Sequence, residues 1–410
     1  MKTAIGPIFR LNRNEKKIKI KQISKALDIS QSKISNFENE RTTLSEKQIR
    51  ELYLFIGFEY NNHNMDDLMK KIRFSVLSIY NCICYEKKDI AQKHQNLMEF
   101  KGMVKCSYPY ITWLLGDFIY YVYYPKKAYD YSLHAEQLLD HLEYLEERFK
   151  QILYDTMGLY YKNRCSFDKA NEYFNKALQI SVSDTVTAMT NYHKGVMYNK
   201  CNKPLEALLM IQKAKQIFDE NSNFYRSVMC CFEIGNVYMN LDYYEKAENM
   251  YKSCLRNVKK TSFEEPIRLY NNLLWDYLLW GKYNKVLYYG EKAIKIDSEF
   301  PMVYFYMAFS CWKTNNKELQ KTYLKCMQNC MSNALKKNQL LMKAFTFYIS
   351  NKNIKSKEKI LVKAYESYIE NRNHKFALFT LKLLAEMFQK EGEIFKELHY
   401  KNMILDLIKV

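Results

Sequence analysis

The sequence predicts an all-α fold with two parts, a small N-terminal domain of short helices and a long array of helix pairs. Glycine and proline are scarce, with 10 and 6 residues in 410, and sheets and turn-rich folds need more of both. Small and aromatic residues also recur at a fixed spacing between Ile152 and Cys254, which is typical of repeated helix pairs. A chain of this length exceeds one ordinary core, so two or more units are expected.

Composition limits the classes of function. The sequence has no run of about 18 uncharged apolar residues and no long apolar stretch before Arg10, so we predict neither a membrane span nor a secretory signal, and expect a cytoplasmic protein. The 11 cysteines are not at zinc-ligand spacing, the 7 histidines are scattered, and no glycine-rich phosphate loop occurs. We therefore predict no metal, no cofactor and no catalytic site. The net charge of +18 favours an anionic partner, most commonly nucleic acid.

Three short amphipathic helices are predicted at the start of the chain, over Ala4–Asn14, Ile20–Leu27 and Gln31–Asn39. Ser30 is a good N-cap residue for the third helix, and only Asp28-Ile29 lies between the second helix and that cap. Because the turn is so tight, the two helices must cross steeply. This arrangement is typical of a helix-turn-helix, whose second helix lies in the DNA major groove.

The run ISKALDISQSKISNFENE (Ile23–Glu40) resembles the phage-repressor (Cro-type) helix-turn-helix family. The resemblance implies a buried structural ion pair between Arg13 in the first helix and Glu38 in the third. Three positions depart from the family pattern, since Ser24 replaces the usual Ala, Asp28 replaces the turn Gly, and Ile20 stands where the family often has a Gln.

Polar side chains that face outward from the third helix are the predicted base-reading groups, because Gln and Asn can pair with adenine and Lys with guanine or phosphate. The family often has a phosphate-contacting Gln where this chain has Ile20, so a neighbouring lysine is expected to make that contact. The predicted DNA-binding residues are Gln31, Ser32, Lys33, Ser35, Asn36, Lys19 and Lys21. Such proteins usually read two half-sites, so a homodimer on operator DNA is expected. The alternative is a solvated basic face without a DNA partner.

A further helix, Glu46–Phe55, is predicted to start at the cap residue Ser45 and to end at Gly57. The polar stretch Glu59–Asp67 follows and is interpreted as a domain boundary. We therefore predict a DNA-binding domain over residues 1–66 and a repeat domain over residues 67–410.

Three consecutive segments match a helix-pair repeat of about 34 residues. Small residues are needed where the helices approach closely, and aromatic residues fill the remaining gaps. The matching residues are Gly158, Tyr161, Ala170, Phe174 and Ala177, then Gly195, Tyr198, Ala207, Ile211 and Ala214, then Gly235, Tyr238, Ala247, Tyr251 and Cys254. This is the pattern of tetratricopeptide repeats. The rest of the domain, including a predicted helix over Ala128–Phe149, is interpreted as degraded copies. Together they predict a right-handed superhelix of roughly eight to nine helix pairs.

The first helix of each pair is expected to face a concave groove. Asn amides both donate and accept hydrogen bonds, so a row of them can hold the backbone of an extended peptide, and aromatic residues can form pockets beside it. The predicted peptide-binding residues are Asp155, Lys162, Tyr192, Asn199, Phe232, Asn236, Asn240 and Asn271. Trp275, Phe305, Phe309 and Trp312 are predicted to line the groove farther along. The alternative is that Asn is simply common in this chain and the aromatic residues form the core.

A Cro-type helix-turn-helix followed by a tetratricopeptide array resembles the RRNPP family of peptide-pheromone receptors of Gram-positive bacteria. The resemblance implies a cytoplasmic quorum-sensing transcription regulator. Such a protein dimerises through its repeats, binds operator DNA, and is modulated by a short signalling oligopeptide in the groove. The alternative is a tetratricopeptide regulator of a response regulator or another protein partner, in which the basic N-terminal domain attaches to DNA non-specifically. Strong salt dependence without sequence preference would support that alternative.

Overall fold

The computed structural model describes residues 4–60, 65–85, 89–125, 131–257, 266–350, 353–371 and 373–409. Within these ranges the secondary structure is helical and contains no strand, so the predicted all-α fold class is confirmed. No helix in the described part of the chain combines the length and apolar character that a membrane span requires.

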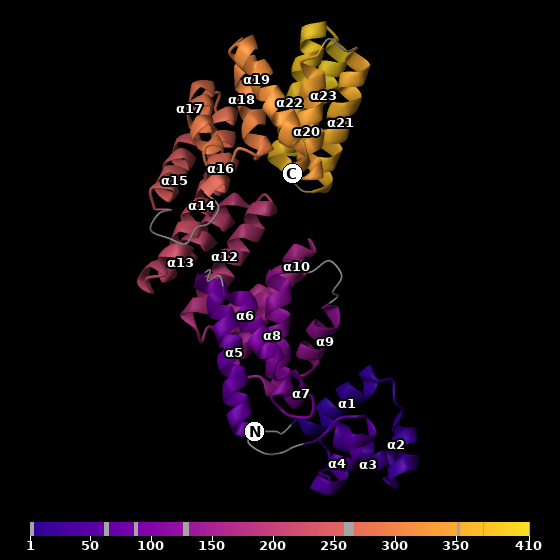
Figure 1. Ribbon diagram of the computed structural model, residues 1–410. Helices are drawn as coiled ribbons and strands as arrows, with labels where there is room; N and C mark the ends of the chain where they lie inside the picture. Colours follow the sequence, from indigo (N-terminus) through magenta and orange to yellow (C-terminus); the bar gives the residue numbers. More distant parts are fainter. Residues whose placement is uncertain are drawn as a thin grey trace. The chain divides into compact units, whose positions relative to one another are not determined.

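The chain divides into two compact units, which are described separately. Unit 1 comprises Met1–Lys194 with Gln216–Arg226, and unit 2 comprises Gly195–Lys215 with Ser227–Val410. The helices of unit 1 are α1 (Ile5–Glu15), α2 (Ile20–Leu27), α3 (Gln31–Glu38), α4 (Glu46–Phe55), α5 (Met65–Tyr85), α6 (Ile90–Met98), α7 (Lys101–Val104), α8 (Tyr110–Tyr123), α9 (Ser132–Asp140), η1 (Leu142–Tyr144), α10 (Glu147–Asn163) and α11 (Phe167–Ile180) (Figure 1).

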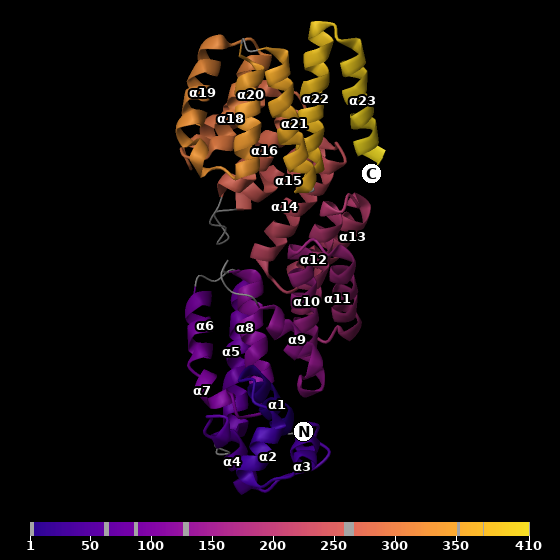
Figure 2. The same ribbon diagram turned by 90° about the vertical axis from the view of Figure 1, so that its right-hand side faces the viewer.

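Three helices contribute residues to both units, namely α12 (Asp184–Lys200), α13 (Pro204–Glu220) and α14 (Phe224–Asn240). The remaining helices of unit 2 are α15 (Tyr244–Asn257), α16 (Pro266–Leu279), α17 (Tyr283–Ile294), α18 (Pro301–Lys313), α19 (Lys317–Cys330), η3 (Met331–Asn333), α20 (Lys336–Tyr348), α21 (Ile354–Glu370), α22 (His374–Glu391) and α23 (Ile394–Lys409). Successive helices pack against each other as pairs, as Figure 2 shows for α20 with α21 and α22 with α23.

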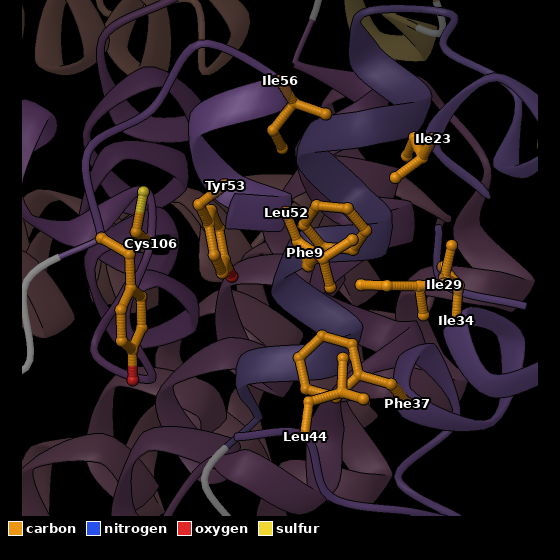
Figure 3. Close-up of a cluster of buried hydrophobic side chains, with 11 residues drawn as sticks. Phe9, Ile23, Ile29, Ile34, Phe37, Leu44, Leu52, Tyr53, Ile56 and Cys106 are labelled. Carbon is orange, nitrogen blue, oxygen red and sulfur yellow. The ribbon is translucent and has the colours of Figure 1, made fainter. Parts of the chain in front are cut away.

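The four short helices α1 to α4, here called the head, enclose a small apolar core. Phe9 of α1 lies at its centre, with its ring 5.3 Å from that of Tyr53 and 6.2 Å from that of Phe37 (Figure 3). Ile23 and Ile34 enter from α2 and α3, so each short helix buries one side and exposes the other. Cys106, from the segment between α7 and α8, completes this core.

Local capping confirms the predicted helix starts. Ser30 accepts a hydrogen bond from the backbone N–H of Lys33, and Ser45 accepts one from that of Gln48, whose side chain accepts from the Ser45 N–H in return. Asp28, which ends α2, has a φ of 52°. This left-handed conformation is tolerated by Asp and explains how the chain turns tightly here without the usual glycine.

The three matched repeats pack as their pattern predicts. A Cβ at Gly158 would lie 2.4 Å from the ring of Phe174, and one at Gly235 would lie 2.7 Å from the ring of Tyr251. A Cβ at Gly195 would lie 2.5 Å from the Cγ1 atom of Ile211. A side chain cannot fit at these distances, so the glycines set how closely the two helices of a repeat approach.

One detail of the predicted array is wrong. The helix expected over Ala128–Phe149 starts outside the described residues and is then interrupted, since α9 ends at Asp140 and α10 begins only at Glu147. The interruption occurs because Leu145 and Glu146 are extended, with Leu145 buried in the core.

The buried pair of Arg13 and Glu38 generates a first prediction. Replacing Glu38 by Gln leaves the guanidinium buried without its counter-charge, which costs about 3–5 kcal/mol. We expect hydrogen exchange of the α1 and α3 amides to accelerate accordingly. The matched control is Glu46→Gln, which removes an exposed pair with Arg50 and should cost less than about 1 kcal/mol. Equal effects of the two variants would contradict a stabilising role for the buried pair.

Asp276 on α16 generates a second prediction. Its side chain is fully buried, and neither carboxylate oxygen has a hydrogen-bond partner among the described residues. Burial, with a further contribution from nearby Glu248, raises its pKa to about 8, and Lys285 opposes this shift. The folded state therefore keeps a proton that the unfolded state releases near its ordinary pKa of 3.8. Stability contributed by this group is complete below that pH and falls as pH rises towards 8.

Asp276→Asn removes this titration. We expect the unfolding free energy of the variant, relative to the parent protein, to increase by about 1.4 kcal/mol for each pH unit between pH 5 and 7. Urea unfolding at several pH values measures this difference directly. Parallel stability curves for the two proteins would show that Asp276 does not hold a proton in the folded state.

Candidate functional site

The outward face of α3 carries the predicted base-reading side chains. Gln31, Ser32, Lys33 and Asn36 are exposed and Ser35 is half-buried, whereas Ile34 and Phe37 point into the head core. This division follows from the helical period, because residues three and four apart share a face. The structure therefore brings all five predicted residues onto or beside one solvent-facing surface of α3.

An ion pair fixes α3 to α1. The Arg13 Nε donates to Glu38 Oε1 at 2.6 Å, its Nη2 donates to Glu38 Oε2 at 2.9 Å, and its Nη1 donates to the carbonyl of Ile18 at 2.7 Å. The pair predicted from the family resemblance is therefore confirmed. Since Arg13 is buried and fully engaged, it orients α3 and is not available for contact with DNA.

Exposed lysines lie at the start of α2. Lys19 is its N-cap residue, where its backbone N–H donates to the side chain of Gln22 at 2.8 Å, and Lys21 lies in the first turn. Both lysine side chains are exposed. The positive end of a helix dipole and free amide groups also lie at a helix start, and these features favour an anion such as phosphate.

The segment between α7 and α8 holds the head against the rest of unit 1. The Asn12 side-chain amide donates to the carbonyl of Lys105, and the Lys105 ammonium lies 3.8 Å from a carboxylate oxygen of Glu15. Lys16 and Lys105 both lie over the ring of Phe58, at 4.4 and 5.1 Å from its centre. The head is therefore held against the segment between α7 and α8 through α1 and the chain that follows α4.

Four of the predicted peptide-binding asparagines lie in unit 2 and form hydrogen bonds with other amides. Asn240 Nδ2 donates to Asn199 Oδ1 at 2.7 Å, which joins α14 to α12. One turn earlier on α14, Asn236 Oδ1 accepts from Asn272 Nδ2 at 2.7 Å and from the hydroxyl of Tyr251 at 2.7 Å. All these amide side chains are half-buried. We name Asn199, Asn240, Asn236, Asn272 and Asn271 the amide strip.

The strip continues along α16. Asn271 Nδ2 donates to Asn272 Oδ1 at 3.1 Å, and Asn271 Oδ1 accepts from the hydroxyl of Tyr306 on α18 at 3.3 Å. Asn272 was missed in the sequence prediction because repeat position alone selected its neighbour. The Asn271-Asn272 doublet was the signal that could have identified it.

Three other predicted residues lie in unit 1, and one of them is buried in a polar cluster. Asp155 is fully buried and accepts from His193 Nδ1 at 3.0 Å and from the Tyr80 hydroxyl at 3.3 Å. Burial lowers the pKa of His193, while the Asp155 carboxylate acts in the opposite direction. Lys162 is half-buried at the end of α10. Asp155 therefore already bonds to His193 and Tyr80 within unit 1, and the sequence analysis did not predict these partners.

The third predicted residue of unit 1, Tyr192, is buried beneath an arginine. The Arg226 guanidinium lies 5.8 Å from the centre of the Tyr192 ring, and its Nε donates to the carbonyl of Cys84 at 3.1 Å. Asn223 donates to the same carbonyl at 3.2 Å. These bonds satisfy carbonyl groups at the end of α5, which a helix leaves without internal partners. No sequence pattern indicated this contact, because the residues are far apart in the chain.

The predicted groove aromatics of unit 2 are packed in the protein interior. Phe305 and Phe309 are buried, and their rings lie 6.4 and 5.2 Å from that of Phe379 on α22. The Trp275 ring stacks on Phe376 of α22 at 4.1 Å with an interplanar angle of 1°. The expectation that these residues line an open groove is therefore wrong, because α22 covers them.

Two further aromatic residues of the prediction have similar surroundings. Trp312 is half-buried, with its ring 5.4 Å from that of Tyr348. Phe232 is buried, and its ring centre lies 6.0 Å from that of Tyr251. Among the predicted residues of unit 2, the asparagines thus keep partial exposure, whereas Phe232 belongs to the packing of a repeat.

Comparison with solved structures identifies the fold as a tetratricopeptide-type helical array. The chain is similar to a Rap protein solved in complex with competence and sporulation factor, with a TM-score of 0.66 and 14% identity over 83% of this chain and 98% of that chain. It is similar to NprR solved with its cognate peptide NprX, with a TM-score of 0.56 and 16% identity over 82% of this chain and 99% of that chain.

Aspartyl phosphate phosphatase F from Bacillus subtilis has the same fold, with a TM-score of 0.59 and 13% identity over 86% of this chain and 97% of that chain. No protein-family model matches the sequence. No curated protein matches it either. At these identities the likenesses establish a shared helical-repeat fold.

Proposed function

We propose that the chain is a cytoplasmic transcription regulator of the RRNPP type, which binds operator DNA through the head as a homodimer. The observation that carries the proposal is the geometry of α3. Its inner side is fixed by the head core and by the Arg13–Glu38 pair, and its outer side carries Gln31, Lys33 and Asn36 in solvent. A rigid helix with an exposed polar face is what direct reading of base edges requires.

We further propose that the repeat domain binds a short signalling oligopeptide at the amide strip. Half-buried amides that bond to one another can exchange those bonds for the N–H and C=O groups of an extended peptide. NprR, whose fold is similar, was solved with a cognate peptide. Asn199, Asn236, Asn240 and Asn271 are the proposed backbone contacts, and Asn272 joins them in the strip.

The remaining predicted residues have different roles in this proposal. Lys162 keeps partial exposure and stays a proposed peptide contact. Asp155, Tyr192 and Phe232 are buried, and we propose that they support the inner surface from beneath.

A second candidate function is the regulation of a protein partner, with the head attached to DNA non-specifically. The likeness to aspartyl phosphate phosphatase F favours it, since a fold of this kind also occurs in a protein named for action on aspartyl phosphate. The two functions differ in one measurable property, which is sequence preference on DNA.

The DNA-reading proposal is tested with Gln31→Ala combined with Asn36→Ala. We expect the parent protein to prefer DNA flanking its own gene over a scrambled duplex at moderate salt, and the variant to lose that preference. Loss of each bidentate base contact costs about 1–3 kcal/mol. Fluorescence anisotropy at several salt concentrations measures both affinities. A control variant, Glu46→Gln with Arg50→Gln on the exposed side of α4, should retain the preference. A parent protein without preference would favour the second candidate function.

The peptide proposal is tested with Asn236→Ala combined with Asn272→Ala. Short peptides encoded beside the gene serve as ligands in calorimetric titrations. Removing a hydrogen bond weakens binding by about 1 kcal/mol, so we expect affinity to fall by about tenfold or more. The control is Asn315→Ala with Asn329→Ala, which changes exposed amides outside the strip. Unchanged affinity in the strip variant would place the peptide elsewhere.

A further inference from the structure

The positive charge of the chain is concentrated far from the head in sequence. Residues 1–66 contain twelve basic and eight acidic side chains, whereas residues 313–363 contain twelve lysines and only two glutamates. The second segment therefore holds an excess of ten charges out of a net +18. It forms α19, α20 and α21 of unit 2. The basic head does not explain this excess.

The lysines on two of these helices form regular rows. Lys317, Lys321 and Lys325 recur every fourth residue along α19, and all three are exposed. The buried residues of α19, Met327 and Cys330, lie on its other side. Since residues four apart share a helix face, the three ammonium groups project from one side of a rigid element.

The same spacing recurs on α21, where Lys355, Lys359 and Lys363 are exposed. Its buried residues, Leu361, Ala364 and Tyr368, lie on the other side of the helix. Exposed Lys343 adds charge on α20, which packs beside α21 (Figure 2). The same lysine spacing therefore occurs on two helices of this part of the array, α19 and α21.

None of the six row lysines forms an ion pair within the described part of the chain. Glu358, which lies between two of them on α21, is instead bonded to Lys396 and to the Tyr400 hydroxyl, each at 2.8 Å. Some lysines elsewhere do have acidic partners one turn away, such as Lys176 with Glu172. Like charges at this spacing destabilise a helix, so folding alone does not favour the rows.

We propose that the two lysine rows form a second DNA-contacting surface, which binds the phosphate backbone of duplex DNA without reading sequence. Successive lysines in a row are about 6 Å apart along the helix axis, so one row spans about 12 Å. The charges of one DNA strand advance by about 3.4 Å along the duplex axis. One row therefore covers a stretch of several phosphates.

The chemistry of the surface favours a nucleic acid over a membrane or a protein. Membrane-surface helices place large apolar side chains beside their basic residues, and protein interfaces have an apolar centre. Among the described residues of the 313–363 segment, only Leu319 and Leu335 are exposed large hydrophobic side chains. The choice of duplex DNA as the partner depends on the proposed function of the head.

The test compares two row variants of the full-length protein with a matched control. One variant combines Lys317→Gln, Lys321→Gln and Lys325→Gln, and the other combines Lys355→Gln, Lys359→Gln and Lys363→Gln. The control combines Lys203→Gln, Lys213→Gln and Lys295→Gln, which removes the same charge from exposed positions of unit 2 outside the segment. A long duplex of scrambled sequence is the probe, and anisotropy is recorded between about 50 and 200 mM salt.

We expect each row variant to bind the scrambled duplex about tenfold more weakly at low salt. The slope of log K against log salt should shrink by about 0.9 for each phosphate that the variant no longer neutralises. The control should match the parent protein. Row variants that match the control would overturn the proposal. A second result would also overturn it. If the row variants lose the parent protein's binding to phosphatidylserine vesicles but still bind the duplex, the rows belong to a membrane surface.

The proposal for the lysine rows and the function proposed for α3 can be rejected independently of each other. Sequence preference, measured as the ratio of operator to scrambled affinity, depends on α3 and should be unchanged by the row variants, because phosphate contacts affect binding to all sequences uniformly. Absence of sequence preference in the parent protein would reject the function proposed for α3. The proposal for the rows would still be decided by comparing the row variants with the control variant on the scrambled duplex.

Discussion

The close approach of two helices within each repeat is the constraint on which the array depends. Where Gly158, Gly195 and Gly235 face Phe174, Ile211 and Tyr251, no room exists for a further carbon atom. The large partner side chain then fills the space that the glycine leaves open, so each pair has its own small core. Because stability accumulates from such local contacts, the surfaces that they do not use are free to change from one repeat to the next.

Polar side chains on α10, α12, α14 and α16 show what this freedom permits. In unit 2 the amide strip satisfies its own hydrogen bonds while remaining half-buried. In unit 1 the equivalent inner positions are closed by a buried pair, Asp155 with His193. A neutral amide can exchange one partner for another at little cost, whereas removing the His193 ring from the fully buried Asp155 side chain deprives that carboxylate of a hydrogen-bond donor. The strip is therefore the better suited of the two to accept a ligand.

Local signals in the sequence predicted most of the fold, and contacts between distant segments account for what was missed. Caps at Ser30 and Ser45 and the glycine positions depend on neighbours within one helix or one repeat, so they could be identified from spacing. The stacking of Trp275 on Phe376 could not, because an aromatic residue has the same sequence pattern whether it lines a groove or is covered by α22. For the same reason Asp155 was predicted to be accessible, although His193 and Tyr80 enclose it.

Charge constrains the fold less than packing does. The placement of charged side chains can therefore indicate a binding partner and not a requirement of folding. Exposed ion pairs contribute little to stability, so an array tolerates a helix whose lysines lack acidic partners. Lys176 and Lys401 nevertheless have such partners one turn away, while the rows on α19 and α21 have none among the described residues. Ten of the eighteen net positive charges lie in this one segment, and an external anionic partner explains that concentration better than solubility, which lysines paired with acids would also provide.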